Sequence, residues 1–157
     1  MSALRLFDAE FLDRLAVEAA AAPRRRKNYN LHAAADYPCQ RFFNALSADS
    51  YVQPHRHADP TKDETLVLLR GMLGAVIFDE AGQVVSAVVL HPGQTADVPH
   101  GTFHTWLALE DGTIFFETKA GPYVPLAPDE KAAFAPPEGD PRVPDYLVWL
   151  KSLCPVR

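Results

Sequence analysis

The sequence predicts a mainly β protein whose strands are antiparallel and form a sandwich or jelly-roll barrel. From Cys39 to Val124, short stretches rich in Val, Ile, Leu, Phe, Tyr and Thr alternate with turn residues, about every eight to twelve positions. No long helical pattern separates these stretches. The chain therefore lacks the crossover segments that a parallel sheet needs.

The expected strands are short and follow one another closely. They cover residues 39–46, 50–54, 64–70, 72–79, 83–90, 94–98, 103–109 and 113–119. Residues 79–82 (DEAG) and 110–112 (EDG) are hairpin signals, because glycine accepts the positive φ that tight turns need.

The N-terminal part is expected to pack on the outside of the strands. Asp8 can cap a helix that runs to about Ala21, and Pro23 ends it. The segment that follows, residues 24–30 (RRRKNYN), is polar and has no periodicity, which is typical of a loop.

The C-terminal part is too rich in proline for a strand to persist. Short helices are expected at about 129–134 and 145–152. The second helix contains Leu147, Trp149 and Leu150, which is too much apolar surface to leave in water. We expect it to dock on the barrel or on a neighbouring subunit.

The length of the chain indicates one domain. Its 157 residues, 48% of them hydrophobic, can bury one core and are too few for two ordinary domains. Within that domain we expect an N-terminal helix and basic loop (1–36), a barrel (37–125) and a proline-rich segment with short helices (126–157).

Composition excludes several classes of function. The formal charge of −5 argues against a general nucleic-acid-binding protein, which needs a basic surface. No apolar run approaches the roughly 20 residues of a membrane span, and the N-terminus lacks the pattern of a signal peptide. We expect a cytoplasmic protein, with Cys39 and Cys154 as free thiols.

Three histidines and one carboxylate have the spacing of a metal site. His55 and His57 are two residues apart, so on a strand their imidazoles leave the same face about 6.6 Å apart. Glu64 opens the next apolar run, from which its carboxylate can reach back to the pair. His104 follows the corner made by Pro99 and Gly101, which delivers it onto a new strand.

A shell of His55, His57, Glu64 and His104 suits one divalent transition metal ion, namely Zn, Fe, Mn, Ni or Co. Two of its imidazoles with the carboxylate would make the iron-oxygenase triad. A single histidine is more often an ordinary core or surface residue, but three at this spacing favour a metal. If Glu64 pairs with a surface cation instead, Asp63 is the alternative ligand.

These residues resemble the two motifs of the cupin superfamily, G-x5-H-x-H-x3-4-E-x6-G and G-x5-P-x-G-x2-H-x3-N. The second matches from Gly93 through His104, and the first matches at His55, His57, Glu64 and Gly71. The chain departs at three places: Asp49 replaces the opening glycine, six residues separate His57 from Glu64, and Ala108 replaces the closing asparagine. The resemblance implies a double-stranded β-helix, the cupin barrel, with a bound metal.

A closer resemblance is to the WbuC family of cupin metalloproteins, which occur in gene clusters for bacterial O-antigen and other surface polysaccharides. It covers roughly residues 7 to 140. The matching segments are 26–30 (RKNYN), 40–46 (QRFFNAL), 51–57 (YVQPHRH), 67–71 (VLLRG) and 121–123 (GPY). The resemblance implies a metal-binding cupin in polysaccharide biosynthesis, without a particular reaction.

Several polar residues are candidates for ligand binding. Arg26 and Lys27 are either the solvated end of the first helix or an anion clamp at the barrel mouth. Others alternate on strands that should line or flank the barrel, so that one of them can orient a substrate. These are Gln40, Arg41, Asn44 and Tyr51.

Three functions fit this pattern. The first is an enzyme, an isomerase, epimerase or lyase, whose metal acts on a small carbohydrate or nucleotide sugar. The second is a metal-dependent binding or regulatory module without turnover, and the third is an iron-dependent oxygenase. The expected partners are a small anionic or sugar-like ligand and a second copy of the chain, since exposed sheet edges favour a homodimer.

Overall fold

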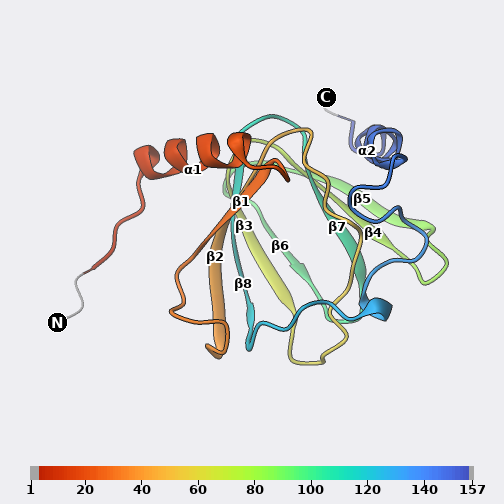
Figure 1. Ribbon diagram of the computed structural model, residues 1–157, viewed down its shortest axis with the longest axis horizontal. Helices are drawn as coiled ribbons and strands as arrows, with labels where there is room; N and C mark the ends of the chain where they lie inside the picture. The colour runs from red at the N-terminus through yellow and green to blue at the C-terminus, as the bar shows by residue number, and fades with distance from the viewer. Residues whose placement is uncertain (1–3, 156–157) are drawn as a thin grey trace.

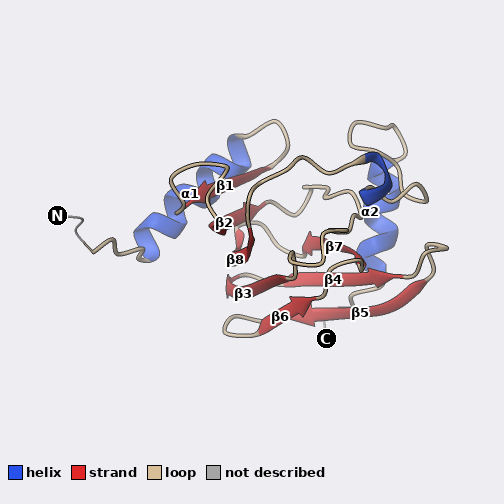
Figure 2. Ribbon diagram, turned by 90° about the horizontal axis from the view of Figure 1, so that it is seen from below, coloured by secondary structure: helices blue, strands red, loops and turns tan. Residues whose placement is uncertain are grey.

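The computed structural model describes residues 4–155, so the outermost residues of the predicted segments 1–36 and 126–157 lie outside it. Two antiparallel sheets pack face to face, with a helix beside each (Figures 1 and 2). The mainly β architecture is confirmed. In order, the elements are α1 (Ala9–Ala21), β1 (Arg26–Asn30), β2 (Cys39–Leu46), β3 (Glu64–Arg70), β4 (Leu73–Phe78), β5 (Val84–Leu90), β6 (Thr95–Val98), β7 (Phe103–Ala108), β8 (Thr113–Ala120), the 3-10 helix η1 (Pro128–Glu130) and α2 (Val143–Ser152).

The larger sheet has the strand order β1-β2-β8-β3-β6, and the smaller sheet has the order β5-β4-β7. Strand β8 is central in the larger sheet. Its register places Lys119 opposite Gln40 of β2 on one side and opposite Glu64 of β3 on the other. These three side chains, which are distant in sequence, therefore meet on one sheet.

The space between the sheets holds the main core. Its buried residues come from both sheets, because alternate side chains of each strand point inward. They are Leu46, Leu66, Leu68, Leu73, Ala75, Leu90, Val98, Trp106, Ala108 and Phe115. This core fills one part of the space between the sheets. Polar side chains occupy the other part.

Helix α1 covers the outer face of the larger sheet (Figure 1). Asp8 caps it as predicted, since its side chain accepts a hydrogen bond from the Phe11 amide at 3.0 Å. Leu15 and Ala19 are buried against Phe43 and Ile114. The predicted position of this helix outside the barrel is confirmed.

Helix α2 covers the outer face of the smaller sheet. Leu147 and Leu150 are buried in a second core together with Val76 and Leu107 from strands β4 and β7. The expectation that this helix docks on the barrel is confirmed. The other helix expected in the C-terminal segment, at 129–134, is the short 3-10 turn η1.

Two local predictions are wrong. Residues 50–54, expected as a strand, form none. Pro54 has no N–H to donate to a neighbouring strand, and the next residue, His55, forms isolated bridges but no ladder. The basic segment expected as a loop contains β1, an edge strand whose residue Arg26 lies opposite Leu46. The polarity of β1 reflects its exposure at a sheet edge, and its pairing partner is too distant in sequence for the local pattern to indicate.

The predictions for the two hairpin turns and for the cysteines are confirmed. Both predicted hairpin turns contain glycines with positive φ, 80° at Gly82 and 73° at Gly112. Cys39 and Cys154 are free. Among the helices of residues 4–155, none has the length and apolar character needed to cross a membrane.

Candidate metal centre and ligand cavity

His55 and His104 are held together by their own backbones. The His55 amide donates to the His104 carbonyl at 2.9 Å, and the His104 amide donates to the His55 carbonyl at 2.8 Å. This isolated antiparallel bridge leaves the two ring centroids 4.7 Å apart. The sequence placed both residues on strands, whereas His55 lies in an extended loop that the bridge fixes against β7.

Hydrogen bonds orient both rings. His55 Nδ1 lies 3.0 Å from the Gln53 carbonyl, and His104 Nδ1 lies 2.9 Å from the Thr102 carbonyl. Because a carbonyl only accepts, each Nδ1 carries a hydrogen, and in the neutral ring each Nε2 keeps a lone pair. This is the arrangement that metal-binding histidines use.

His104 Nε2 is buried and has no hydrogen-bond partner within the described part of the chain. Its side chain is 1% exposed. A buried polar atom without a partner is unfavourable, and a metal ion would satisfy it.

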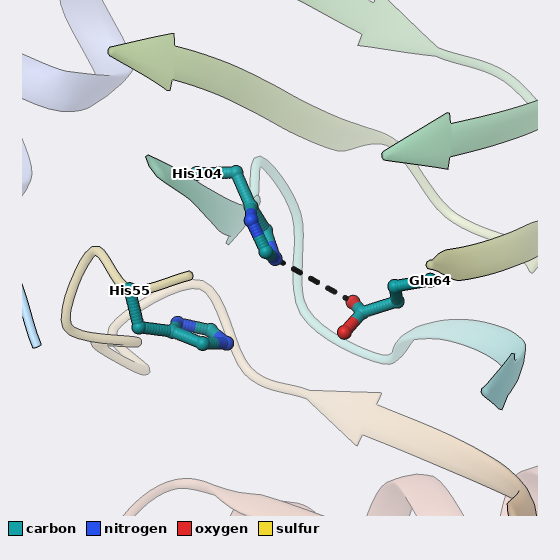
Figure 3. Close-up of side chains that lie close together, drawn as sticks. All are labelled: His55, Glu64 and His104. Carbon is teal, nitrogen blue, oxygen red and sulfur yellow. Dashed lines mark ion pairs between the residues drawn. The ribbon is translucent and has the colours of Figure 1, made fainter. Parts of the chain in front are cut away.

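Glu64, the first residue of β3, completes the group (Figure 3). Its Oε1 accepts a hydrogen bond from Trp106 Nε1 at 2.8 Å and lies 3.7 Å from His104 Nε2. The nearest ligand atoms of His55, Glu64 and His104 all lie within 4.8 Å of one another. These three side chains fit the requirements of a transition metal site and could hold an ion.

His57, the fourth predicted ligand, faces the same group but is engaged differently. Its Nε2 lies 2.9 Å from Glu64 Oε2 and 3.2 Å from Lys119 Nζ. Its ring centroid is 5.4 Å from that of His55 and 6.1 Å from that of His104. The structure thus brings all four residues to one place, and coordination by His57 stays a prediction.

Sequence reasoning missed two residues, Lys119 and Glu117 of β8. Lys119 Nζ donates to Glu117 Oε1 at 2.8 Å and to Glu64 Oε2 at 3.0 Å. Glu117 Oε2 accepts from the Asn44 amide at 2.7 Å. The available signal was the alternation of charged residues along an otherwise apolar strand, which indicates a polar inner face.

The buried charges shift one another. Burial raises the pKa of Glu64, but the ammonium of Lys119 and the neighbouring His104 and His57 outweigh it and hold the pKa well below its usual value. Burial and the neighbouring Glu64 raise the pKa of Glu117 to about 7. Burial lowers the pKa of Lys119, but the two carboxylates raise it above its ordinary value. Lys119 and Glu64 are therefore a charged pair.

The pKa values of the histidines move in opposite directions. Burial and the nearby His104 lower the pKa of His55 to about 3, so this ring is neutral and able to bind a metal. Burial also lowers the pKa of His104, but Glu64 outweighs it and raises this pKa.

The group opens into a cavity of about 590 Å³. Four of the six predicted ligand-binding residues line it: Arg26, Lys27, Gln40 and Asn44. Asn44 points inward to Glu117, whereas the Gln40 amide donates to the Tyr37 carbonyl at 2.8 Å.

The two basic residues of the predicted clamp have acidic partners. Arg26 contacts Glu138 and the Tyr51 carbonyl. The Lys27 ammonium lies 3.7 Å from Glu18 of α1, and the Lys27 side chain is half exposed.

Arg41 and Tyr51 lie away from this cavity. Arg41 alternates onto the other face of β2, where its guanidinium lies 5.9 Å from the centre of the Tyr37 ring. Tyr51 is buried, and its hydroxyl donates to the Pro136 carbonyl at 2.7 Å. Asp63, the alternative metal ligand, instead accepts from His100 at the surface, 2.8 Å from Nδ1.

Comparison with solved structures supports the fold. KdgF from Halomonas sp. is 17% identical with a TM-score of 0.50, over 66% of this chain and 84% of that one. A conserved protein of unknown function from Streptococcus pyogenes, SPY1581, is 13% identical with a TM-score of 0.54, over 79% and 93%. Oxalate decarboxylase from Bacillus subtilis, which has Mn(II) centres, is 18% identical with a TM-score of 0.50, over 63% and 26%. The expected cupin fold is confirmed.

Sequence comparison gives the family. No curated protein matches this chain. A family model matches residues 7–90, more than half of the chain, and its description is "Domain of unknown function (DUF6016)". The match includes the predicted ligands His55, His57 and Glu64, and the chain belongs to this family.

Proposed function

We propose that this protein is a metal-binding cupin that acts on or binds a small carbohydrate or nucleotide-sugar-like ligand in surface polysaccharide (O-antigen) metabolism. The resemblance to the WbuC family supports the biological setting. The metal would be Zn, Fe, Mn, Ni or Co, and the Mn(II) centres of the B. subtilis oxalate decarboxylase support manganese as one candidate.

One observation carries the metal assignment. His104 Nε2 is buried without a hydrogen-bond partner among residues 4–155, and it faces His55 and the Glu64 carboxylate at the wall of the cavity. In a purely structural site, some polar group or backbone atom would satisfy this nitrogen. His55, Glu64 and His104, with His57 as the fourth ligand, would hold the ion.

A bound ion would act as a Lewis acid on a carbonyl or hydroxyl oxygen of the ligand. Neighbouring residues would orient the side chains that hold the ion. The carbonyls of Gln53 and Thr102 hold the imidazoles in one tautomer, and Trp106 fixes the Glu64 carboxylate.

The cavity suits a polar ligand of sugar size. Its volume of about 590 Å³ lies within the range of small-molecule sites. The side chains of Asn28, Asn30 and Asn44 line it, and amides both donate and accept hydrogen bonds with hydroxyl groups. This composition supports a carbohydrate more than an apolar ligand.

Metal analysis of protein purified without a nickel column tests the proposal. We expect about one ion per chain in the wild type and a sharp loss in His104→Ala. His100→Ala is the matched control, because His100 is near in sequence but pairs with Asp63 at the surface. Unchanged metal content in His104→Ala would refute the ligand assignment, and a metal-free wild type would refute the proposed function.

A second candidate function has its own observation. The three ligand atoms that converge belong to two histidines and one carboxylate, the composition of non-haem iron oxygenase sites. Oxygen consumption by Fe(II)-loaded protein in the presence of sugar acids or nucleotide sugars, compared with Zn-loaded protein, tests this function. Equal rates for the two metals would count against it.

A further inference from the structure

The cavity carries the opposite charge to the protein. The whole chain has a formal charge of −5. Among the residues that line the cavity, five are lysines or arginines and only two are carboxylates; these residues are Arg24, Arg26, Lys27, Lys62, Lys119, Glu64 and Glu117. Glu138 pairs with Arg24 and Arg26, and Glu18 lies near Lys27, so these two further carboxylates reduce the excess to about one positive charge. An excess of cations at a cavity of an acidic protein still favours an anionic ligand.

Lys119 is the cation nearest to the metal centre. Its side chain is 18% exposed and lines the cavity, so the ammonium is within reach of a ligand. Cross-strand register places it directly opposite Glu64, and its Nζ lies 3.0 Å from Glu64 Oε2. A ligand that reached the ion would therefore also meet this ammonium.

The charge balance of the site calls for an anion. With both carboxylates ionised, Glu64, Glu117 and Lys119 together carry one negative charge, which a divalent ion would convert to one positive charge. A buried net charge is unfavourable unless a counter-ion joins it, and a ligand with one negative charge supplies that counter-ion.

The hydrogen bonds of Lys119 also favour an anionic ligand. An ammonium has three N–H donors. Two of those of Lys119 are directed at Glu117 and Glu64, and Nζ also lies 3.2 Å from His57 Nε2. If His57 gives its Nε2 to the metal, as its motif predicts, one donor becomes free beside the ion. That N–H can donate a hydrogen bond to an acceptor atom of the ligand.

We propose that Lys119 is the specificity-determining residue of this site and binds the carboxylate of a hydroxylated monoanion, such as a sugar acid, next to the metal. This inference rests on the proposed function and names its substrate class. A phosphate monoester has a charge of about −1.5 to −2 at neutral pH, which is more than the single positive charge of the metal-loaded site with both carboxylates ionised. The carboxylate is therefore the favoured anion.

The test compares two probes that differ only in this group, D-glucuronate and its neutral amide, D-glucuronamide. Calorimetric titrations use protein whose metal content has been measured, alongside metal-depleted protein. We expect the metal-loaded wild type to bind the acid about ten-fold more tightly than the amide, because a charge-assisted hydrogen bond is lost with the amide. Metal-depleted protein should show no such preference.

Variants assign the preference to the residue. Lys119→Met, loaded at a metal concentration that saturates the site and with its metal content measured, should lose the preference for the acid. Lys151→Met on α2, which does not line the cavity, should keep the preference. If Lys119→Met does not fold, the double variant Lys119→Met with Glu117→Gln removes one charge of each sign and should give the same result.

Three outcomes would overturn this inference while leaving the metal site intact. The metal-loaded wild type could bind the two probes equally well, or it could bind neither probe. The preference for the acid could also survive in Lys119→Met. A wild type that takes up no metal would instead refute the proposed function, and the inference with it. Metal content and probe preference are measured separately, so the two failures are distinguishable.

Discussion

Trp106 donates its indole N–H to Glu64 Oε1 at 2.8 Å, in a part of the barrel where both side chains are almost fully buried. The other oxygen of this carboxylate is left to His57 and Lys119. Trp106 thus belongs to the core and also orients the single acidic residue of the candidate metal centre. Its removal should therefore affect the metal centre as well as the fold.

We expect Trp106→Phe to weaken metal binding by about ten-fold, because hydrogen bonds to a ligand residue typically contribute this much to affinity. Competition with a chromogenic chelator measures the change. Trp149→Phe is the control, since Trp149 is 39% exposed on α2 and should leave affinity unchanged. Equal affinities in the wild type and Trp106→Phe would show that this bond does not support the site.

Gly71 should not tolerate a side chain. Its φ is 81°, and an added Cβ would lie 2.7 Å from the Thr113 Cα atom. We expect Gly71→Ala to lower the free energy of unfolding by about 2 to 4 kcal/mol, from the left-handed backbone and the clash together.

Urea denaturation measures this loss against Gly93→Ala. Gly93 has a similar φ of 88°, but nothing lies within 4 Å of its added Cβ. That control should lose only about 1 kcal/mol. Equal losses in the two variants would mean that the contact with Thr113 is relieved at no cost.

Glu138 should make the stability of the protein depend on pH. Arg24 donates to both of its oxygens, at 2.8 and 2.6 Å, and Arg26 contacts it as well. Burial raises the pKa of Glu138, but the two arginines outweigh it and lower this pKa below 4.5. The stabilisation is therefore complete above pH 4.5 and is lost as the pH falls through the lower pKa of the folded state.

We expect Glu138→Gln to lose about 0.5 to 1 kcal/mol of stability at neutral pH and much less at about pH 3. Chemical denaturation at several pH values gives this difference. Glu10→Gln, which removes a fully exposed pair with Arg14, should show little effect at any pH. A loss that is the same at all pH values would rule out the ionic origin.

Helix α2 should be integral to the domain. Leu150 is fully buried between α2 and the smaller sheet, so Leu150→Ala should cost about 2 to 4 kcal/mol. Val148→Ala on the same helix, at a side chain that is 69% exposed, should change stability by less than about 0.5 kcal/mol. A small effect of Leu150→Ala in denaturation would show that the helix is only loosely attached.

Local patterns in the sequence were sufficient for the elements that depend on near neighbours. Short stretches of β-forming residues between turn residues identified the strands from β2 to β8, and Asp8 marked the start of α1. The spacing of His55, His57, Glu64 and His104 indicated a shared site, although His55 and His57 lie in an extended loop and not on the strand that the prediction assumed.

Pairing between distant segments decided the rest. The strand character of β1 comes from its contact with β2, and the cavity position of Lys119 comes from its register against Glu64. The sequence by itself determined which residues could bind a metal. Only the tertiary structure decided which cation stands beside them, because strand register depends on the packing of the whole sheet and not on the residues nearby.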